Sequence, residues 1–149
     1  MKKITEKQIL EGNKLIAEFM GWRNIRKERP ELGFNYDIWQ SFRLFELGSL
    51  ITGIKQSPLD SKYEMVDKLY FHSDWNWLMS VVEKIENCFD SNIQFDIKGN
   101  GWVLISLGSQ YAMAFQEIDL DIEVREATKI ESVYCGCIEF IKWHNKFTK

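Results

Sequence analysis

No apolar run in this 149-residue chain approaches the roughly 20 residues that span a bilayer. The apolar core of a secretory signal peptide is also missing from the first residues, MKKITEKQIL. The chain has three cysteines, an odd number that does not suit the disulfide framework of a small secreted protein. We therefore expect a cytoplasmic protein with reduced thiols and no membrane association.

Net charge is also low. The formal charge of −3 at pH 7 provides no overall attraction to nucleic acid or to an anionic membrane surface. The length of the chain and its apolar content of 45% fit one compact domain, residues 1–149. We therefore expect no nucleic-acid partner and no second domain.

Motifs of the common catalytic sites are missing as well. The chain has no nucleophile elbow of the GxSxG kind, no Walker loop and no Rossmann fingerprint. The alternating Asp119, Asp121 and Glu123 could bind a divalent cation or act as paired carboxylates. They lack the glycine and the terminal glutamate of an EF-hand loop, and a charged solvent face explains them better. The sequence predicts a protein that is not an enzyme and has no cofactor.

The histidines favour structural roles. His72, Ser73 and Asp74 are the residue types of a hydrolase triad, but three neighbours in sequence rarely converge as base, nucleophile and orienting group. A zinc site would require folding to bring His72, His144 and a cysteine together. We therefore expect no catalytic residue and no metal ligand among them.

The chain does contain a well-marked central helix. The segment HSDWNWLMSVVEKIE starts with Ser73, a preferred N-cap residue, and Asp74 suits the positive end of the helix dipole. Its large apolar residues share one wide arc, which must be covered by other parts of the chain. This helix is therefore expected to form a wall of the core.

Two further amphipathic helices are indicated by capping boxes. Thr5 with Gln8 begins the first, which ends near Gly21, and Thr128 with Glu131 begins the last. The apolar periodicity predicts helices at about residues 6–20, 73–89 and 129–147.

Strands are expected between the second and third helices. Residues 93–98 alternate apolar and polar side chains, and the Gly-Asn-Gly turn at 99–101 leads into a second strand at 102–107. Residues 111–116 and 118–124 offer further strands. The sequence thus predicts an α+β fold, in which three amphipathic helices pack on a small, mostly antiparallel sheet.

The segment from Arg23 to Phe71 is harder to interpret. Pro30 and Gly33 interrupt its charged beginning, which we expect to be a loop. The aromatic segment that follows could hold one or two strands or a short helix, and strands are favoured. Ser61 with Glu64 has the pattern of a capping box and could begin a helical turn.

Three stretches carry a family resemblance. KLIAEFMGW at 14–22, HSDWNWLMSVVEKIE at 72–86 and, at 129–145, KIESVY followed by CIEFIKWHN resemble small proteins of Bacteroides-type bacteria and their prophages. Their layout is similar to that of phage α-β-α sandwich domain proteins. The resemblance implies a shared fold of helices on a small sheet. It implies no activity and no catalytic residue.

Aromatic residues are abundant, with six Trp, ten Phe and five Tyr. Most of them must form the core, but several lie at the margins of apolar faces, where an interface could use them. Basic residues beside Trp22 could meet a phosphate while the indole stacks on a base. The predicted contact residues are Trp22, Arg23, Arg26, Trp39, Trp77, Trp102 and Trp143.

Three functions follow from these observations. The preferred one is a non-enzymatic binding or adaptor protein of phage or prophage type, which acts through protein–protein contacts in the bacterial cytoplasm and could form a homodimer. The alternative is a protein that binds or sequesters a small, nucleotide-like ligand. The third is an enzyme that uses His72 or the acidic residues Asp119, Asp121 and Glu123.

Overall fold

The computed structural model describes residues 4–35, 37–41, 62–65, 69–108 and 120–147. The chain divides into two compact units, one formed by residues 1–9 and 70–149 and the other by residues 10–69. We call them the sheet–helix unit and the central unit. That the whole chain forms one domain stays a prediction.

The sheet–helix unit contains a three-stranded antiparallel sheet in the order β4–β5–β6. Its strands are β4 (Ile93–Lys98), β5 (Trp102–Leu107) and β6 (Asp121–Arg125). A 3₁₀ turn, Gly99–Gly101, joins β4 to β5, and Gly101 has a φ of 71°, a conformation that glycine adopts without steric cost. The predicted hairpin is therefore confirmed. Strand β6 confirms the later part of the strand expected at 118–124, whereas 111–116 lies outside the described residues.

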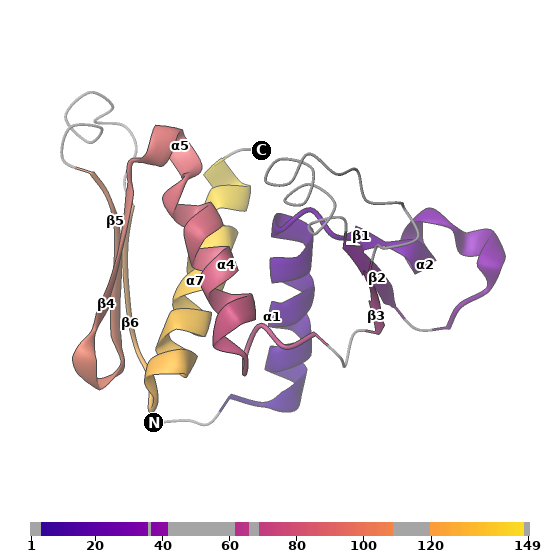
Figure 1. The fold of residues 1–149 in the computed structure, drawn as a ribbon, viewed down its shortest axis with the longest axis horizontal. Helices are drawn as coiled ribbons and strands as arrows, with labels where there is room; N and C mark the ends of the chain where they lie inside the picture. Colours follow the sequence, from indigo (N-terminus) through magenta and orange to yellow (C-terminus); the bar gives the residue numbers. More distant parts are fainter. Residues whose placement is uncertain (1–3, 36, 42–61, 66–68, 109–119, 148–149) are drawn as a thin grey trace, which may run out of the picture. The chain divides into compact units, whose positions relative to one another are not determined.

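Two long helices cover one face of this sheet, α4 (Trp75–Glu86) and α7 (Lys129–Phe147) (Figure 1). Glycine at position 136 lets α7 approach the sheet closely, since a Cβ there would lie 3.0 Å from Cγ1 of Val103. Apolar side chains at every second position of the strands point toward α4 and α7. Together with apolar side chains of these helices they form the core. The fully buried members are Leu78, Val81, Ile85, Val103, Ile105, Val133, Cys137, Phe140 and Ile141.

The N-cap of α4 differs from the prediction. Asp74, not Ser73, is the N-cap residue, and its carboxylate accepts hydrogen bonds from the backbone N–H groups of Asn76 and Trp77. Both residues can cap a helix, so propensity alone did not separate them. The helix also ends earlier than expected, at Glu86, and a short helix, α5 (Cys88–Ser91), follows it.

The first helix, α1 (Glu6–Phe19), starts where its capping box predicts. Its first residues belong to the sheet–helix unit. The Gln8 side chain accepts a hydrogen bond from the Thr5 backbone N–H at 2.9 Å, and the Gln8 N–H donates to the Thr5 hydroxyl at 3.1 Å. Gly21, with a φ of 83°, follows the helix at its C-terminal end. All three predicted helices are present.

The central unit contains the rest of α1 and a second antiparallel sheet, in the order β1–β2–β3. Its further elements are β1 (Arg23–Asn24), α2 (Ile25–Glu28), a 3₁₀ turn (Pro30–Leu32), β2 (Ile38–Ser41) and β3 (Lys62–Met65). The loop predicted for the charged segment after Trp22 is therefore wrong. Asn24 caps α2, and the backbone of Asn24 pairs with β2.

Two further predictions fall in this unit. Residues 62–65 pair with β2 as a strand, so the helical turn expected from Ser61 and Glu64 is wrong. The capping-box pattern is short, and the backbone partners that β2 supplies override it. The strand predicted in the aromatic segment is confirmed for residues 38–41. With two antiparallel sheets and three long helices among the described residues, the fold is α+β.

Within the described residues, no helix is both long and apolar enough to cross a lipid bilayer.

Candidate interaction surface

The face of the β4–β5–β6 sheet that lies opposite α4 and α7 carries the most organised group of exposed side chains in the sheet–helix unit. No described helix or strand of this unit lies on that side (Figure 1). We call it the outer face. It consists of Gln94, Asp96 and Lys98 from β4, Trp102, Leu104 and Ser106 from β5, and Asp121, Glu123 and Arg125 from β6.

The strand register arranges the outer face in three rows. Residues directly opposite each other in antiparallel strands share a face, with Cβ atoms about 4.5–5.5 Å apart. The first row is Lys98, Trp102 and Arg125; the second is Asp96, Leu104 and Glu123; the third is Gln94, Ser106 and Asp121. The β4 and β6 positions are exposed and the β5 positions are half-buried. Apolar side chains therefore lie in the middle of the face, with charged ones on both sides.

Trp102 and Arg125 form the closest contact in the first row. The guanidinium carbon of Arg125 lies 4.1 Å from the centroid of the Trp102 ring, within the range of a cation–π interaction. The Trp102 Nε1 atom is buried and has no hydrogen-bond acceptor within the described parts of the chain. The Arg125 side chain is itself 60% exposed and lies 3.5 Å from the Glu123 carboxylate. The arginine can therefore leave the ring at little cost, because a cation–π contact at an exposed site contributes about 0.5–1 kcal/mol and an exposed ion pair about 0–1 kcal/mol.

The outer face has the composition of a protein-binding surface. Tryptophan and arginine are the residue types most enriched among the side chains that dominate binding energy, and such side chains lie inside a polar rim. Trp102 was among the predicted contact residues, whereas Leu104 and Arg125 were not. Five of the six residues of β5 are apolar, so alternation within this strand gives no signal in the sequence that Leu104 lies on the solvent side.

A second aromatic group surrounds Trp143 at the end of α7. The Trp143 and Phe147 rings stack with an interplanar angle of 6° and centroids 5.3 Å apart, and Phe89 packs its edge against Phe147 at 5.5 Å. Phe147 is 45% exposed. Phe89 has a φ of 52°, which is unusual for a bulky residue, and the Asn92 side chain donates to its carbonyl at 2.7 Å. Much of this group belongs to the packing between α5 and α7.

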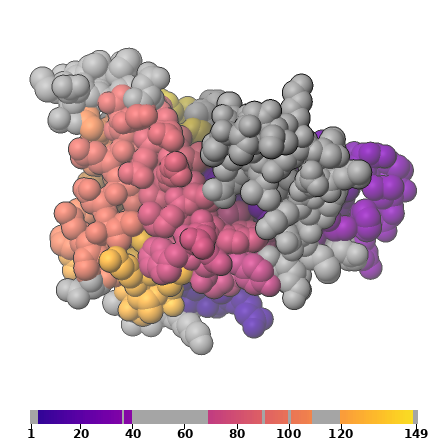
Figure 2. Space-filling view, viewed as in Figure 1, coloured from indigo at the N-terminus to yellow at the C-terminus, as the bar shows by residue number. Residues whose placement is uncertain are grey.

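The other predicted tryptophan contacts differ in their burial. Trp77 is half-buried and packs against Phe71 with ring centroids 5.1 Å apart. Trp39 is 1% exposed, so it is not accessible to a partner, and Trp22 is half-buried. By contrast, Trp75 and Met79, one turn apart on α4, are each 41% exposed and were not predicted. Helix α4 is on the visible surface in Figure 2, beside the β4–β5 hairpin.

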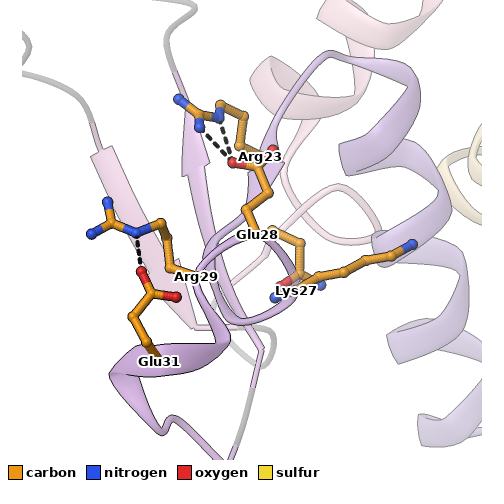
Figure 3. Close-up of polar contacts among 6 residues, drawn as sticks. Arg23, Lys27, Glu28, Arg29 and Glu31 are labelled. Atoms are coloured by element: carbon orange, nitrogen blue, oxygen red, sulfur yellow. Dashed lines mark hydrogen bonds and ion pairs between the residues drawn. The ribbon is translucent and has the colours of Figure 1, made fainter.

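The predicted phosphate-binding arginines are already engaged in ion pairs within the central unit. Arg23 pairs with Glu28, its Nε donating to Oε2 at 2.7 Å, and Figure 3 shows this pair and the pair of Arg29 with Glu31. Arg26 lies 3.7 Å from the Asp37 carboxylate.

Asp37 is the most enclosed acid of this network. The Lys14 ammonium lies 2.9 Å from its carboxylate, and that hydrogen bond is the main reason why the pKa of Asp37 is lowered, against the opposing effect of burial. These neighbouring carboxylates cancel much of the positive charge that a phosphate group would require, so the segment does not favour a nucleotide.

The histidines lie in aromatic surroundings. His72 packs edge-on against Tyr134 with centroids 6.2 Å apart, and His144 stacks on Phe140 at 5.9 Å. Burial lowers the pKa of both histidines, and the nearby Lys84 charge adds to the effect at His144. No group of three or more His, Cys, Asp and Glu side chains gathers in the described residues in a way that could hold a metal ion. Asp119 lies outside those residues, while Asp121 and Glu123 belong to the outer face.

Comparison of this chain with protein-family models, with curated proteins and with solved structures finds no match.

Proposed function

We propose that this protein is a non-enzymatic binding or adaptor protein that contacts another protein through its outer face. The observation that carries the proposal is the pair Trp102 and Leu104, placed side by side on the middle strand of a sheet face that α4 and α7 leave open. Charged side chains flank the pair on β4 and β6. An apolar centre within a polar rim is the arrangement of a protein–protein interface.

The chemistry of the outer face supports contact better than catalysis. Its carboxylates and basic groups on β4 and β6 are exposed on an open pleated surface, whereas a catalytic site usually holds its substrate in a concave pocket. A residue pair such as Trp102 and Leu104 instead gains about 25 cal/mol for each Å² of apolar surface that a partner covers. A phage or prophage setting for this adaptor rests on the resemblance of the three stretches in the sequence and stays a prediction.

Site-specific photo-crosslinking in cells tests the proposal. A photoreactive phenylalanine analogue replaces Ser106, which lies next to Leu104 along β5 on the outer face. A matched control carries the analogue at Glu139, an exposed position on α7. We expect discrete crosslinked protein bands from position 106 that disappear when Trp102→Ala is added, and none of these bands from position 139.

Equal crosslinking from both positions, or bands at position 106 that Trp102→Ala leaves unchanged, would contradict the proposal. Circular dichroism of the Trp102→Ala protein checks that loss of the bands does not come from unfolding, because Trp102 is only half-buried and its removal should leave the sheet in place.

A further inference from the structure

The charges of the outer face are ordered along the strands. The first row carries two positive side chains, Lys98 and Arg125, one on each edge strand. The second row carries two negative ones, Asp96 and Glu123, on the same two strands. The middle strand places one large apolar side chain in each of these rows, Trp102 and then Leu104. Neighbouring rows are about 6.6–6.8 Å apart, the length of two residues of a strand.

This order makes the outer face complementary to itself. Two copies can face each other through a two-fold axis that lies in the plane of the interface. This axis is perpendicular to the strands and passes between the first and second rows. The axis reverses the strand direction and keeps β4 opposite β4 and β6 opposite β6. Lys98 then lies opposite Asp96 of the second copy, Arg125 opposite Glu123, and Trp102 opposite Leu104. Symmetry repeats each contact, so four ion pairs surround two apolar contacts.

Other two-fold arrangements of the same face bring like charges together. An axis parallel to the strands places β4 opposite β6, so that Lys98 meets Arg125 and Asp96 meets Glu123. An axis across the strands but through the second row places Asp96 opposite Asp96 and Glu123 opposite Glu123. Like charges directly opposite each other are destabilising. Charge therefore selects one register of the two sheets. Packed sheets cross at about 30°, and at this angle Trp102 still lies opposite Leu104 of the second copy.

From this complementarity we infer that the protein that binds the outer face is a second copy of this chain, in a two-fold symmetric, face-to-face sheet dimer. The inference rests on the proposed function, since it names the partner of the same surface. The isologous contact is the commonest form of homo-oligomer. In it, Arg125 moves from the Trp102 ring to Glu123 of the second copy, and Leu104 of that copy takes the place of the guanidinium on the ring.

The size of the face sets the strength of this dimer. The two opposed rows contribute six side chains from each copy, fewer than the roughly 20–30 residues that a standard interface contributes. The dimer is therefore weak and concentration-dependent, with a dissociation constant in the micromolar range or above.

Charge reversal at one symmetric pair tests the register. In Arg125→Glu, the new carboxylate faces Glu123 of the second copy, and in Glu123→Arg, the new guanidinium faces Arg125 of the second copy. Symmetry repeats each of these repulsive contacts. We expect each variant alone to be a monomer at concentrations where the natural protein is a dimer, with a dissociation constant raised at least about tenfold.

An equimolar mixture of the two variants should form a heterodimer. The new carboxylate of one variant then faces the new guanidinium of the other, and the unchanged Glu123 of the first faces the unchanged Arg125 of the second. Every opposed pair in the mixed dimer is again an ion pair. Sedimentation velocity over a concentration series measures the two variants and their mixture.

A control and a rescue complete the experiment. Glu139→Arg changes an exposed acid on α7 and should leave the dissociation constant unchanged. The double variant Arg125→Glu with Glu123→Arg restores every opposed pair and should dimerise by itself. Circular dichroism checks that each variant is folded, which we expect because both positions on β6 are exposed.

The outcomes separate this inference from the proposed function. A natural protein that stays monomeric at every concentration overturns the dimer, and so does a dimer that both single variants retain. In either case the outer face could still contact another protein, which the crosslinked bands from position 106 report independently. Monomeric single variants and a heterodimer in their mixture establish the sheet dimer in the register described.

Discussion

The Ser132 hydroxyl joins the first turn of α7 to the β4–β5 turn, because it donates a hydrogen bond to the Gly101 carbonyl at 2.5 Å. The same oxygen accepts a hydrogen bond from the Glu126 backbone N–H at 2.8 Å. Ser132 is fully buried, so water cannot replace it readily. One small side chain thereby holds together the helix, the hairpin and the end of β6.

Replacement of Ser132 by alanine should lower the free energy of unfolding by about 1–3 kcal/mol, because it leaves a buried carbonyl and a backbone N–H without this partner. Urea denaturation followed by circular dichroism measures the change. Ser73→Ala, at an exposed position, is the control and should remain within about 0.5 kcal/mol of the natural protein. A loss at Ser132 no larger than the control would show that the bridge contributes nothing.

Gly136 should not tolerate a larger side chain. A Cβ at this position would lie 3.0 Å from Cγ1 of Val103 and 3.5 Å from Cδ1 of Ile105, and both of these residues are fully buried. Gly136→Val should therefore cost about 1–3 kcal/mol through overpacking. Glu139→Val, on the exposed side of the same helix, gives the helix the same valine without the clash. Equal unfolding free energies for the two variants would refute the close approach of α7 to β5.

The N-cap of α4 is a direct test of two neighbouring residues. Asp74→Ala removes the carboxylate that accepts from two backbone N–H groups and should lower stability by about 1 kcal/mol. Ser73→Ala should have little effect. Chemical denaturation of both variants decides the matter, and the reverse order of effects would restore Ser73 as the cap.

Stability should fall as the pH is lowered through the range where histidine titrates. Burial lowers the pKa of His72 and of His144 below 6.5 in the folded protein, so the unfolded chain takes up protons first. The contribution of the neutral histidines is complete above about pH 6.5 and is lost as the pH falls toward their folded pKa values. Denaturation at a series of pH values measures the slope, and His72→Gln or His144→Gln should each reduce it. A flat profile between about pH 7 and about pH 5 would contradict this expectation.

The cysteine thiols should react slowly in the folded protein. Burial, with smaller effects from Glu126, Glu131 and Glu139, raises the pKa of Cys135 to about 11. Burial also raises the pKa of Cys88 and of the fully buried Cys137. Because the thiolate is the reactive form, alkylation by iodoacetamide near neutral pH should be much slower in buffer than in urea. Rapid labelling of the native protein, followed by mass spectrometry, would show an accessible thiolate.

Local patterns were sufficient to predict the long helices and the hairpin. The capping boxes at Thr5 and Thr128 start helices where expected, with the Glu131 N–H donating to the Thr128 hydroxyl at 3.2 Å. The alternation of residues 93–98 identified β4 and its buried face. These signals are short in range, because a cap or a strand period depends on residues within a few positions of each other.

Longer-range pairing was beyond those patterns. Residues 62–65 form a strand because β2 supplies backbone partners, although the capping-box pattern of Ser61 and Glu64 indicated that a helical turn could begin there. Arg23 and Arg26 were predicted to be available for a ligand, yet Glu28 and Asp37 neutralise them within the central unit. Trp39 and Trp102 were both predicted contact residues, yet Trp39 is buried and Trp102 is half-buried, because burial depends on which elements cover each side chain.

The sequence by itself determined the α+β composition, the three amphipathic helices and the alternation that divides strand β4 into an apolar and a polar side. Only the tertiary structure decided that Lys98, Trp102 and Arg125 share one row and that Asp96, Leu104 and Glu123 share the next. The reason is physical: the side on which a residue lies follows from its own strand, but its neighbours across the sheet follow from the register between strands, which depends on residues far apart in the chain.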